Sequence, residues 1–150
     1  MAFDSKNTSS AASPTPTPGP RPRSTSTIAA YLTDRHLFIT GATGFLAKVL
    51  VEKILFEQPD VGTLYLLIRA PHDAAANTRL LDLIRDSPVF DRLRARHGEQ
   101  YTSFMSTKLV AVSGSLGQPG LGLSPAMLAR LTDHVEVFIN SAATTTFDER

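Results

Sequence analysis

The stretch HLFITGATGFLAKVLVEKIL, residues 36–55, limits the possible folds of this chain more than any other part of it. An apolar run comes first, two glycines spaced three apart follow (Gly41 and Gly44), and apolar residues then recur at helical spacing. A strand, a glycine turn and a helix in this order make the first half of a βαβ unit. The apolar run at residues 63–69 lies at the distance expected for the second strand of the unit.

The same alternation of short apolar runs and longer amphipathic segments continues along the chain. Each apolar run is nearly continuous, as expected for strands buried on both faces. Strands are predicted at residues 36–40, 63–69, 108–112 and 135–140. Helices are predicted at residues 44–58, 73–85, 88–97 and 124–134. The fold class is therefore α/β: a Rossmann-type doubly wound parallel sheet, with only the first β-α-β-α-β-α-β half present.

The predicted helices carry signals for their caps and buried faces. Asp73 is expected to cap the second, and Ser124 with Pro125 gives the last the strongest capping signal in the chain. The first helix is expected to bury the stripe Leu46, Val49, Leu50 and Ile54. Its charged side chains are expected to lie mostly on the wetter side: Lys48, Glu52, Lys53 and Glu57.

Residues 1–27 differ from the rest, with eleven Ser or Thr, five Pro and a single acid, Asp4. Such a segment cannot bury enough apolar surface to offset its ordering entropy, so we expect a disordered tail there, followed by the Rossmann-type domain at residues 28–150, incomplete at its carboxyl end. A Ser-rich, acid-poor tail also resembles an organelle transit peptide. A flexible tail without a targeting role fits the same composition.

The amino-acid composition indicates that the binding partner is a small molecule. Fifteen basic and fourteen acidic residues nearly cancel, which argues against a nucleic-acid surface or a polybasic membrane patch. No cysteine is present, which excludes disulfides and thiolate catalysis, and the four histidines show no metal-ligand spacing. No apolar run approaches the roughly 18 residues that a membrane span requires.

The glycine turn is expected to bind phosphate, because a helix amino terminus presents free N–H groups and the positive end of its dipole. Gly41 permits a sharp turn, and Gly44 lets a phosphate approach the backbone. Ala47 is the third small residue, which allows the helix to pack closely on the strand. Thr40 and Thr43 can add hydroxyl donors.

The end of the second strand decides between the two nicotinamide cofactors. An NAD enzyme usually places Asp or Glu there for the ribose 2′-hydroxyl, whereas this chain has Arg69. A guanidinium binds a 2′-phosphate that a carboxylate would repel, so NADPH is favoured over NADH. Arg79 or Arg85 could take this role instead, and Arg69 could also be an ordinary solvated charge.

The ends of the third and fourth strands are expected to complete the site. In the strand order 3-2-1-4, strands 1 and 4 meet at the topological switch point where a cofactor binds. The small polar turn after strand 4 is predicted to line the nicotinamide-side ribose: Asn140, Ser141, Ala142 and Ala143. The end of strand 3 is predicted to lie near the adenine: Gly114, Ser115 and Leu116. Each segment could instead be a plain loop.

At these residues the sequence resembles the extended short-chain dehydrogenases/reductases, and more closely the fatty acyl-CoA reductases of the plant male-sterility group. FITGATGFLAKVLVEKIL, DVGTLYLLIRA and NSAATTTFDER carry the resemblance, from about residue 28 to the end. It implies NADPH-dependent reduction of long-chain fatty acyl-CoA to an aldehyde and then a primary alcohol, for wax, suberin or pollen-wall lipids. Carried over by residue, cofactor roles fall on Thr40, Gly41, Thr43, Gly44, Phe45, Leu46, Arg69 and 140–143.

The resemblance also implies a catalytic Tyr-x-x-x-Lys motif that this chain does not contain. Its tyrosines, Tyr31, Tyr65 and Tyr101, have no Lys four residues later. We therefore expect no catalytic residue here, and expect the chain to be the cofactor-binding part of a truncated or longer reductase. A plastid location is expected if residues 1–27 are a transit peptide; otherwise the cytoplasm or the endoplasmic reticulum surface is expected.

Two alternatives remain open from the sequence. Thioester reductase domains share the glycine motif and the arginine, so a thioester reductase or an epimerase-like relative would have the same fold and a different substrate. A non-catalytic NADP-binding fragment is the other alternative.

Overall fold

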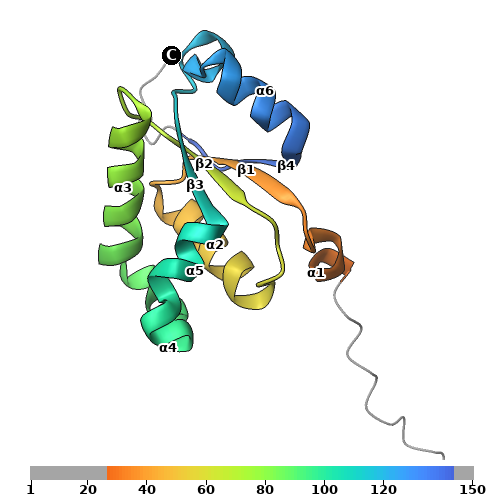
Figure 1. Cartoon of the computed structure of the whole chain (residues 1–150), viewed down its shortest axis with the longest axis vertical. Coiled ribbons are helices and arrows are strands. Elements are labelled where there is room, and N and C mark those ends of the chain that lie inside the picture. The colour runs from red at the N-terminus through yellow and green to blue at the C-terminus, as the bar shows by residue number, and fades with distance from the viewer. Residues whose placement is uncertain (1–26, 144–150) are drawn as a thin grey trace, which may run out of the picture.

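The computed structural model describes residues 27–143, which form a four-stranded parallel sheet with helices on both faces (Figure 1). The strands lie in the order β3-β2-β1-β4. Their bounds are β1 His36–Thr40, β2 Leu64–Ile68, β3 Leu109–Ser113 and β4 Val135–Asn140. The predicted strands, their order and the α/β class are confirmed. The tail assigned to residues 1–27 lies outside the described residues except for Thr27.

The helices connect the strands in the predicted alternation. Their bounds are α1 Thr27–Leu32, α2 Phe45–Glu57, α3 Asp73–Asp86, α4 Asp91–His97, α5 Tyr101–Lys108 and α6 Pro125–His134. Short 3₁₀ turns occupy Pro88–Phe90, Gly98–Gln100 and Pro119–Gly122. The sequence prediction omits α1 and α5. Helix α5 buries only Tyr101 and Met105, a single i, i+4 pair, which is too little periodicity to detect.

Two apolar clusters fill the space on either side of the sheet. One face of the strands packs against α2, α3, α4 and α5, with Leu37, Leu66 and Leu93 fully or almost fully buried between them. The other face packs against α6, where Phe38 and Tyr65 meet Leu131. Helix α6 lies on the opposite side of the sheet from the other large helices (Figure 1). The reason is the strand order: β2 and β3 are added on one side of β1, and β4 is added on its other side.

The expectation that β4 is buried on both faces is wrong for the part of the chain that the structure describes. Strands β1 and β2 are almost entirely buried, but β4 alternates between half-buried and exposed residues. Val137 and Ile139 pack on the larger cluster, whereas Phe138 on the other face is 59% exposed. Strand β4 is the edge of the sheet, and α6 covers only part of that face.

Helix α2 buries only part of the stripe that the sequence predicts: Ile54 is buried, and Leu50 is half-buried against the larger cluster. Leu46 and Val49 are 69% and 37% exposed, while Ala47 and Val51 are buried against the sheet. Glu52, expected to face water, is only 5% exposed and lies 3.7 Å from the Arg92 guanidinium of α4. The small Ala47 faces the strands because it allows the helix axis to approach the sheet.

The sequence predicts the N-cap residues of two other helices, and one of the two predictions is wrong. Asp73 does not cap α3; the preceding residue, His72, accepts a hydrogen bond from the Ala75 N–H at its Nδ1. Ser124 caps α6 as predicted, its hydroxyl accepting from the Met127 N–H at 3.2 Å. His72 escapes sequence analysis because histidine is an uncommon N-cap, and acidic residues such as Asp73 are favoured in the first turn as well as at the cap.

Candidate cofactor-binding site

Gly41 begins the turn that carries the chain from β1 to α2. Its φ of +69° lies in the left-handed region that favours glycine. A Cβ at this position would lie 2.7 Å from the carbonyl group of Ser141 and from the nitrogen of Ala142. The turns after β1 and β4 therefore touch backbone to backbone, and only glycine fits between them.

The amino terminus of α2 opens next to this contact. Gly44 is the N-cap residue and donates no side chain to the cap, and the first turn contains no acidic residue. The N–H groups of residues 45–47 therefore keep their hydrogen-bonding capacity, since a helix supplies no carbonyl for them. A Cβ on Gly44 would meet only the Gly41 carbonyl oxygen, at 3.1 Å, so the outer side of the turn is open. This geometry suits a phosphate.

A cleft of about 310 Å³ lies above the carboxyl ends of β1, β2 and β3. Seven of the fourteen predicted cofactor residues line it: Gly41, Thr43, Arg69, Gly114, Ser115, Leu116 and Ala142. Leu67 and Arg79 complete its lining. Sequence reasoning gives no role to Leu67, because an apolar residue inside a buried strand carries no sign that it reaches a cleft.

The other seven predicted residues do not line the cleft. Thr40 is fully buried below it and bonds Asn140, while Ser141 contributes its backbone to the contact with Gly41. Gly44 begins the helix. Phe45 and Leu46 are 73% and 69% exposed. The last of the seven, Ala143, is exposed at the end of the described chain. Their cofactor roles stay predictions.

Two arginines give the cleft its charge. Arg69, directly after β2, is exposed and has no ion pair among residues 27–143. Arg79 on α3 donates a hydrogen bond to the Arg69 carbonyl oxygen, which holds its guanidinium at the end of β2. No carboxylate lines this cleft in the part of the chain that the structure describes. The cleft is therefore cationic.

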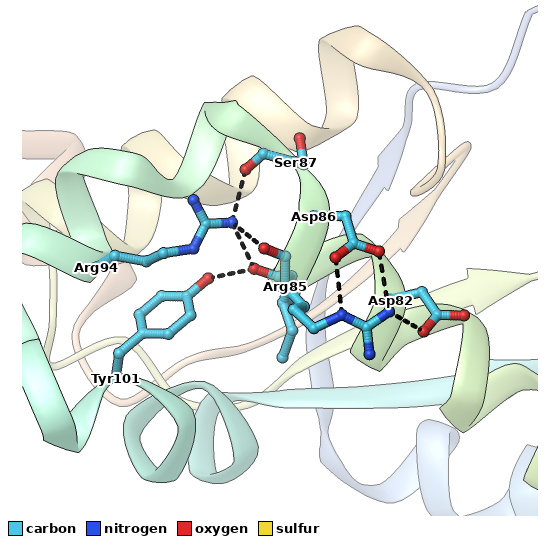
Figure 2. A network of polar contacts seen from close by, with 7 residues as sticks. Asp82, Arg85, Asp86, Ser87, Arg94 and Tyr101 are labelled. Carbon is cyan, nitrogen blue, oxygen red and sulfur yellow. Dashed lines mark hydrogen bonds and ion pairs between the residues drawn. The ribbon is translucent and has the colours of Figure 1, made fainter.

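Arg85, the third arginine that could serve a 2′-phosphate, is engaged elsewhere. Its guanidinium bonds Asp82 at 2.8 Å and Asp86 at 2.7 Å (Figure 2). These bonds raise the pKa of Arg85, chiefly through Asp86, and the bond from Arg85 lowers the pKa of Asp86. Arg85 does not line the cleft, so the structure favours Arg69 and Arg79.

Taken together, these groups fit a dinucleotide phosphate better than a neutral ligand. The open helix amino terminus supplies donors for a pyrophosphate, and the outer side of the turn at Gly44 is uncovered. The guanidiniums stand at the end of β2, where the adenosine ribose of a Rossmann cofactor lies. Among the residues described, no helix has the length and apolar character to cross a bilayer.

Comparison with known proteins gives the same assignment. The sequence pattern of the NAD-binding family described as male sterility protein matches residues 39–150. Fatty acyl-CoA reductase 2, chloroplastic, of Arabidopsis thaliana is 46% identical over 123 residues, which are 82% of this chain and 20% of the relative. Alcohol-forming fatty acyl-CoA reductase of Simmondsia chinensis is 38% identical over 125 residues, 83% of this chain and 25% of the relative.

Among solved structures, the reductase domain of a nonribosomal peptide synthetase from Mycobacterium tuberculosis is similar in fold, with a TM-score of 0.59 and 28% identity. The match covers 82% of this chain and 29% of that domain. The chain thus spans a fifth to a quarter of the curated relatives named above. The glycine turn, the strand order and these similarities agree, and the chain belongs to the male sterility protein family of NAD-binding domains, whose relatives include fatty acyl-CoA reductases.

Proposed function

We propose that this chain binds NADPH in the cleft above β1, β2 and β3 and forms the cofactor-binding part of an alcohol-forming fatty acyl-CoA reductase. The observation that carries the cofactor choice is the pair Arg69 and Arg79, standing at the end of β2 with no carboxylate lining the cleft among the described residues. A carboxylate at this place would accept hydrogen bonds from the ribose hydroxyls of NADH. Two guanidiniums instead favour a 2′-phosphate.

The substrate proposal rests on relatives and not on a visible pocket. Proteins named fatty acyl-CoA reductases match about four fifths of the chain at 46% and 38% identity. When bound, NADPH would supply hydride to the thioester carbonyl of a long-chain acyl-CoA with release of the coenzyme A thiol, and a second NADPH would reduce the aldehyde to a primary alcohol. This chain would hold the cofactor through its glycine turn and arginines, and other residues would contribute the catalytic acid.

Cofactor titration tests the proposal directly. We expect the full 150-residue chain to bind NADPH at least tenfold more tightly than NADH, and Arg69→Ala to remove most of that difference. Arg96→Ala is the matched control, since Arg96 lies on α4 against Phe56, away from the cleft. Equal affinity of the unaltered chain for both cofactors would contradict the NADPH assignment.

The substrate class needs a second assay. A longer protein that contains this sequence should oxidise NADPH when a long-chain acyl-CoA is added. It should release a fatty alcohol, which mass spectrometry detects. The similarity to a peptide synthetase reductase domain favours a carrier-bound thioester as the second candidate. Turnover of an acyl-phosphopantetheinyl carrier protein in preference to acyl-CoA would support that candidate and overturn the first.

A plastid location is also proposed, on two grounds. Residues 1–27 have a composition rich in Ser and Thr with a single acid, and one relative is named chloroplastic. A fluorescent protein fused after residue 27 should accumulate in plastids of a plant cell. Fluorescence outside the plastids would contradict this location. A diffuse pattern would then indicate the cytoplasm, and a reticular pattern would indicate the surface of the endoplasmic reticulum.

A further inference from the structure

A second hollow continues from the cofactor cleft toward the outside of the molecule. It has a volume of about 500 Å³ and runs between the start of α2 and the side of α3. Thr43 and Arg79 line both the hollow and the cleft, so the two spaces adjoin at these side chains. The remaining lining is Lys48, Asp82, Leu83, Asp86, Ser87 and Pro88.

Lys48 occupies an unfavourable place for a cation. It stands in the first full turn of α2, next to the positive end of the helix dipole, and no acidic residue in that turn compensates it. The side chain is half-buried and has no ion pair among residues 27–143. By contrast Lys53, farther along the same helix, pairs with Glu57 at 2.7 Å. A bound anion would relieve the repulsion at Lys48.

The two carboxylates of the hollow are bound to another partner. Figure 2 shows Arg85 between Asp82 and Asp86, bonding the first through Nη2 and the second through Nε and Nη2. With Arg85 included, three cations stand against two carboxylates around the hollow. Both carboxylates are bonded to Arg85, and neither forms an ion pair with Lys48 or Arg79 among the described residues. Lys48 and Arg79 therefore remain available to bind an anion.

We propose that Lys48 is a specificity-determining residue for NADPH: its ammonium binds the 2′-phosphate where the hollow and the cleft adjoin, together with Arg79. Arg85 acts through Asp82 and Asp86 as a positioning residue, because it lowers the repulsion that these carboxylates would exert on the phosphate. This inference rests on the proposed binding of NADPH. It adds a residue in the first turn of α2 to the arginines that are proposed to bind the 2′-phosphate at the end of β2.

The test is a calorimetric titration of the full 150-residue chain with NADPH, NADH and 2′,5′-ADP. Lys48→Met should weaken NADPH and 2′,5′-ADP about tenfold and leave NADH within about twofold, since a charge-assisted hydrogen bond to the 2′-phosphate is lost. Lys48→Arg should retain most of the affinity. Lys53→Met, which removes a charge from the exposed side of the same helix, should change none of the three.

Arg85→Gln tests the indirect part of the inference. It should weaken NADPH about threefold without affecting NADH, and Asp82→Asn with Asp86→Asn in the same chain should restore the affinity. A spectrum of circular dichroism and a thermal melt for each variant separate lost binding from lost folding. If Lys48→Met fails to fold, Lys48→Gln replaces it, because glutamine keeps a polar side chain and removes the charge.

The outcomes distinguish this inference from the proposed function. If Arg69→Ala removes the preference for NADPH and Lys48→Met does not weaken NADPH, the proposed function stands and the role of Lys48 is wrong. If Lys48→Met weakens NADPH and NADH equally, Lys48 serves a group common to both cofactors, and the role in specificity is overturned. If the unaltered chain does not prefer NADPH, both proposals fail.

Discussion

Thr40 and Asn140, one hundred residues apart in the sequence, join the carboxyl ends of β1 and β4 by a hydrogen bond from Thr40 Oγ1 to Asn140 Oδ1. The two residues are also paired in the register of the sheet. Asn140 Oδ1 accepts a second bond, from the Ala142 N–H at 3.3 Å. One amide oxygen therefore fixes the turn after β4 against the turn after β1, which is the place where Gly41 leaves no room for a side chain.

Removal of this bond should weaken both the fold and the site. Thr40 is fully buried, so Thr40→Val keeps the shape and loses the donor, at a cost of about 1–2 kcal/mol in the free energy of unfolding. Affinity for NADPH and NADH should fall together, because the bond positions a turn shared by both. Urea denaturation and cofactor titration measure the two effects.

Thr78→Val is the control for that substitution. Thr78 is exposed on α3, and its hydroxyl bonds only the Ala74 carbonyl of the same helix. We expect a change below about 0.5 kcal/mol. Equal stability of the Thr40 and Thr78 variants would mean that the link between β1 and β4 contributes nothing to the fold.

Gly41→Ala should be far more damaging than the same substitution at Gly98. Both glycines have positive φ, +69° and +52° respectively, so alanine is strained at both positions whatever the space around it. A Cβ at Gly98 meets no atom within 4 Å, whereas at Gly41 it lies 2.7 Å from backbone atoms of β4's turn. The excess loss of stability at Gly41, measured in urea, reports the displacement of that turn.

Cofactor binding separates the two glycines further. Gly41→Ala should abolish detectable binding of NADPH, since the turn that it distorts forms one wall of the cleft. Gly98→Ala, at the end of α4, should bind with unaltered affinity once corrected for the unfolded fraction. Normal binding by a folded Gly41→Ala chain would show that the contact between the two turns is dispensable.

Arg94 stabilises the carboxyl end of α3 from outside the helix. Its Nη2 donates to the carbonyl oxygens of Ile84, Arg85 and Ser87 at 2.8–2.9 Å. Figure 2 shows Arg94 beside Arg85 and Ser87. Arg94→Met should lower the free energy of unfolding by about 2–3 kcal/mol, because half-buried carbonyls lose a charged donor. Arg130→Met is the control, since Arg130 is exposed on α6 and its guanidinium lies over the Tyr65 ring, 5.6 Å from the centroid. Similar losses for the two variants, measured in urea, would contradict this role.

Tyr101 should make stability depend on alkaline pH. Its hydroxyl donates to the Ile84 carbonyl at 2.8 Å, and burial raises its pKa above the ordinary value of 10.0. The folded state thus holds its proton more tightly than the unfolded state, so the stabilisation is complete below pH 10 and is lost as the pH rises through and above that value. Denaturation curves of the unaltered chain and of Tyr101→Phe, recorded from pH 8 upward, test this.

Tyr101→Phe should lose part of that pH dependence and little else at neutral pH. The Ile84 carbonyl keeps its bond to Arg94, so no buried acceptor is left without a donor and the cost is about 0.5–1 kcal/mol. If the two proteins lose stability in parallel above pH 10, the tyrosine is not the group responsible.

The strand order and the glycine turn could be predicted because their signals are local and mutually consistent. Each strand is a short apolar run, and Gly41 and Gly44 lie between the first of these and a helical pattern. The parallel arrangement follows, since each connection is long enough for a crossover helix. Half of the predicted cofactor residues then meet in one cleft.

The errors come from contacts that local patterns do not specify. Helix α2 has two apolar stripes that share Ile54, and the choice between them depends on Ala47 fitting against the sheet. Glu52 is buried because Arg92, forty residues later, lies across it. Tyr101 is buried because α5, which has almost no apolar period, packs beside α3. In each case a partner distant in sequence decides the outcome.

The pairing of β4 with β1 has a consequence for the order in which this protein assembles. The register joins Thr40 to Asn140, the longest sequence separation in the sheet, so loop-closure entropy opposes this step more than the pairing of β1 with β2. During synthesis the glycine turn leaves the ribosome about one hundred residues before the segment that forms its opposite wall. The cofactor can therefore bind the complete cleft only after β4 has paired with β1: it stabilises that pairing and does not guide the pairings of β1, β2 and β3.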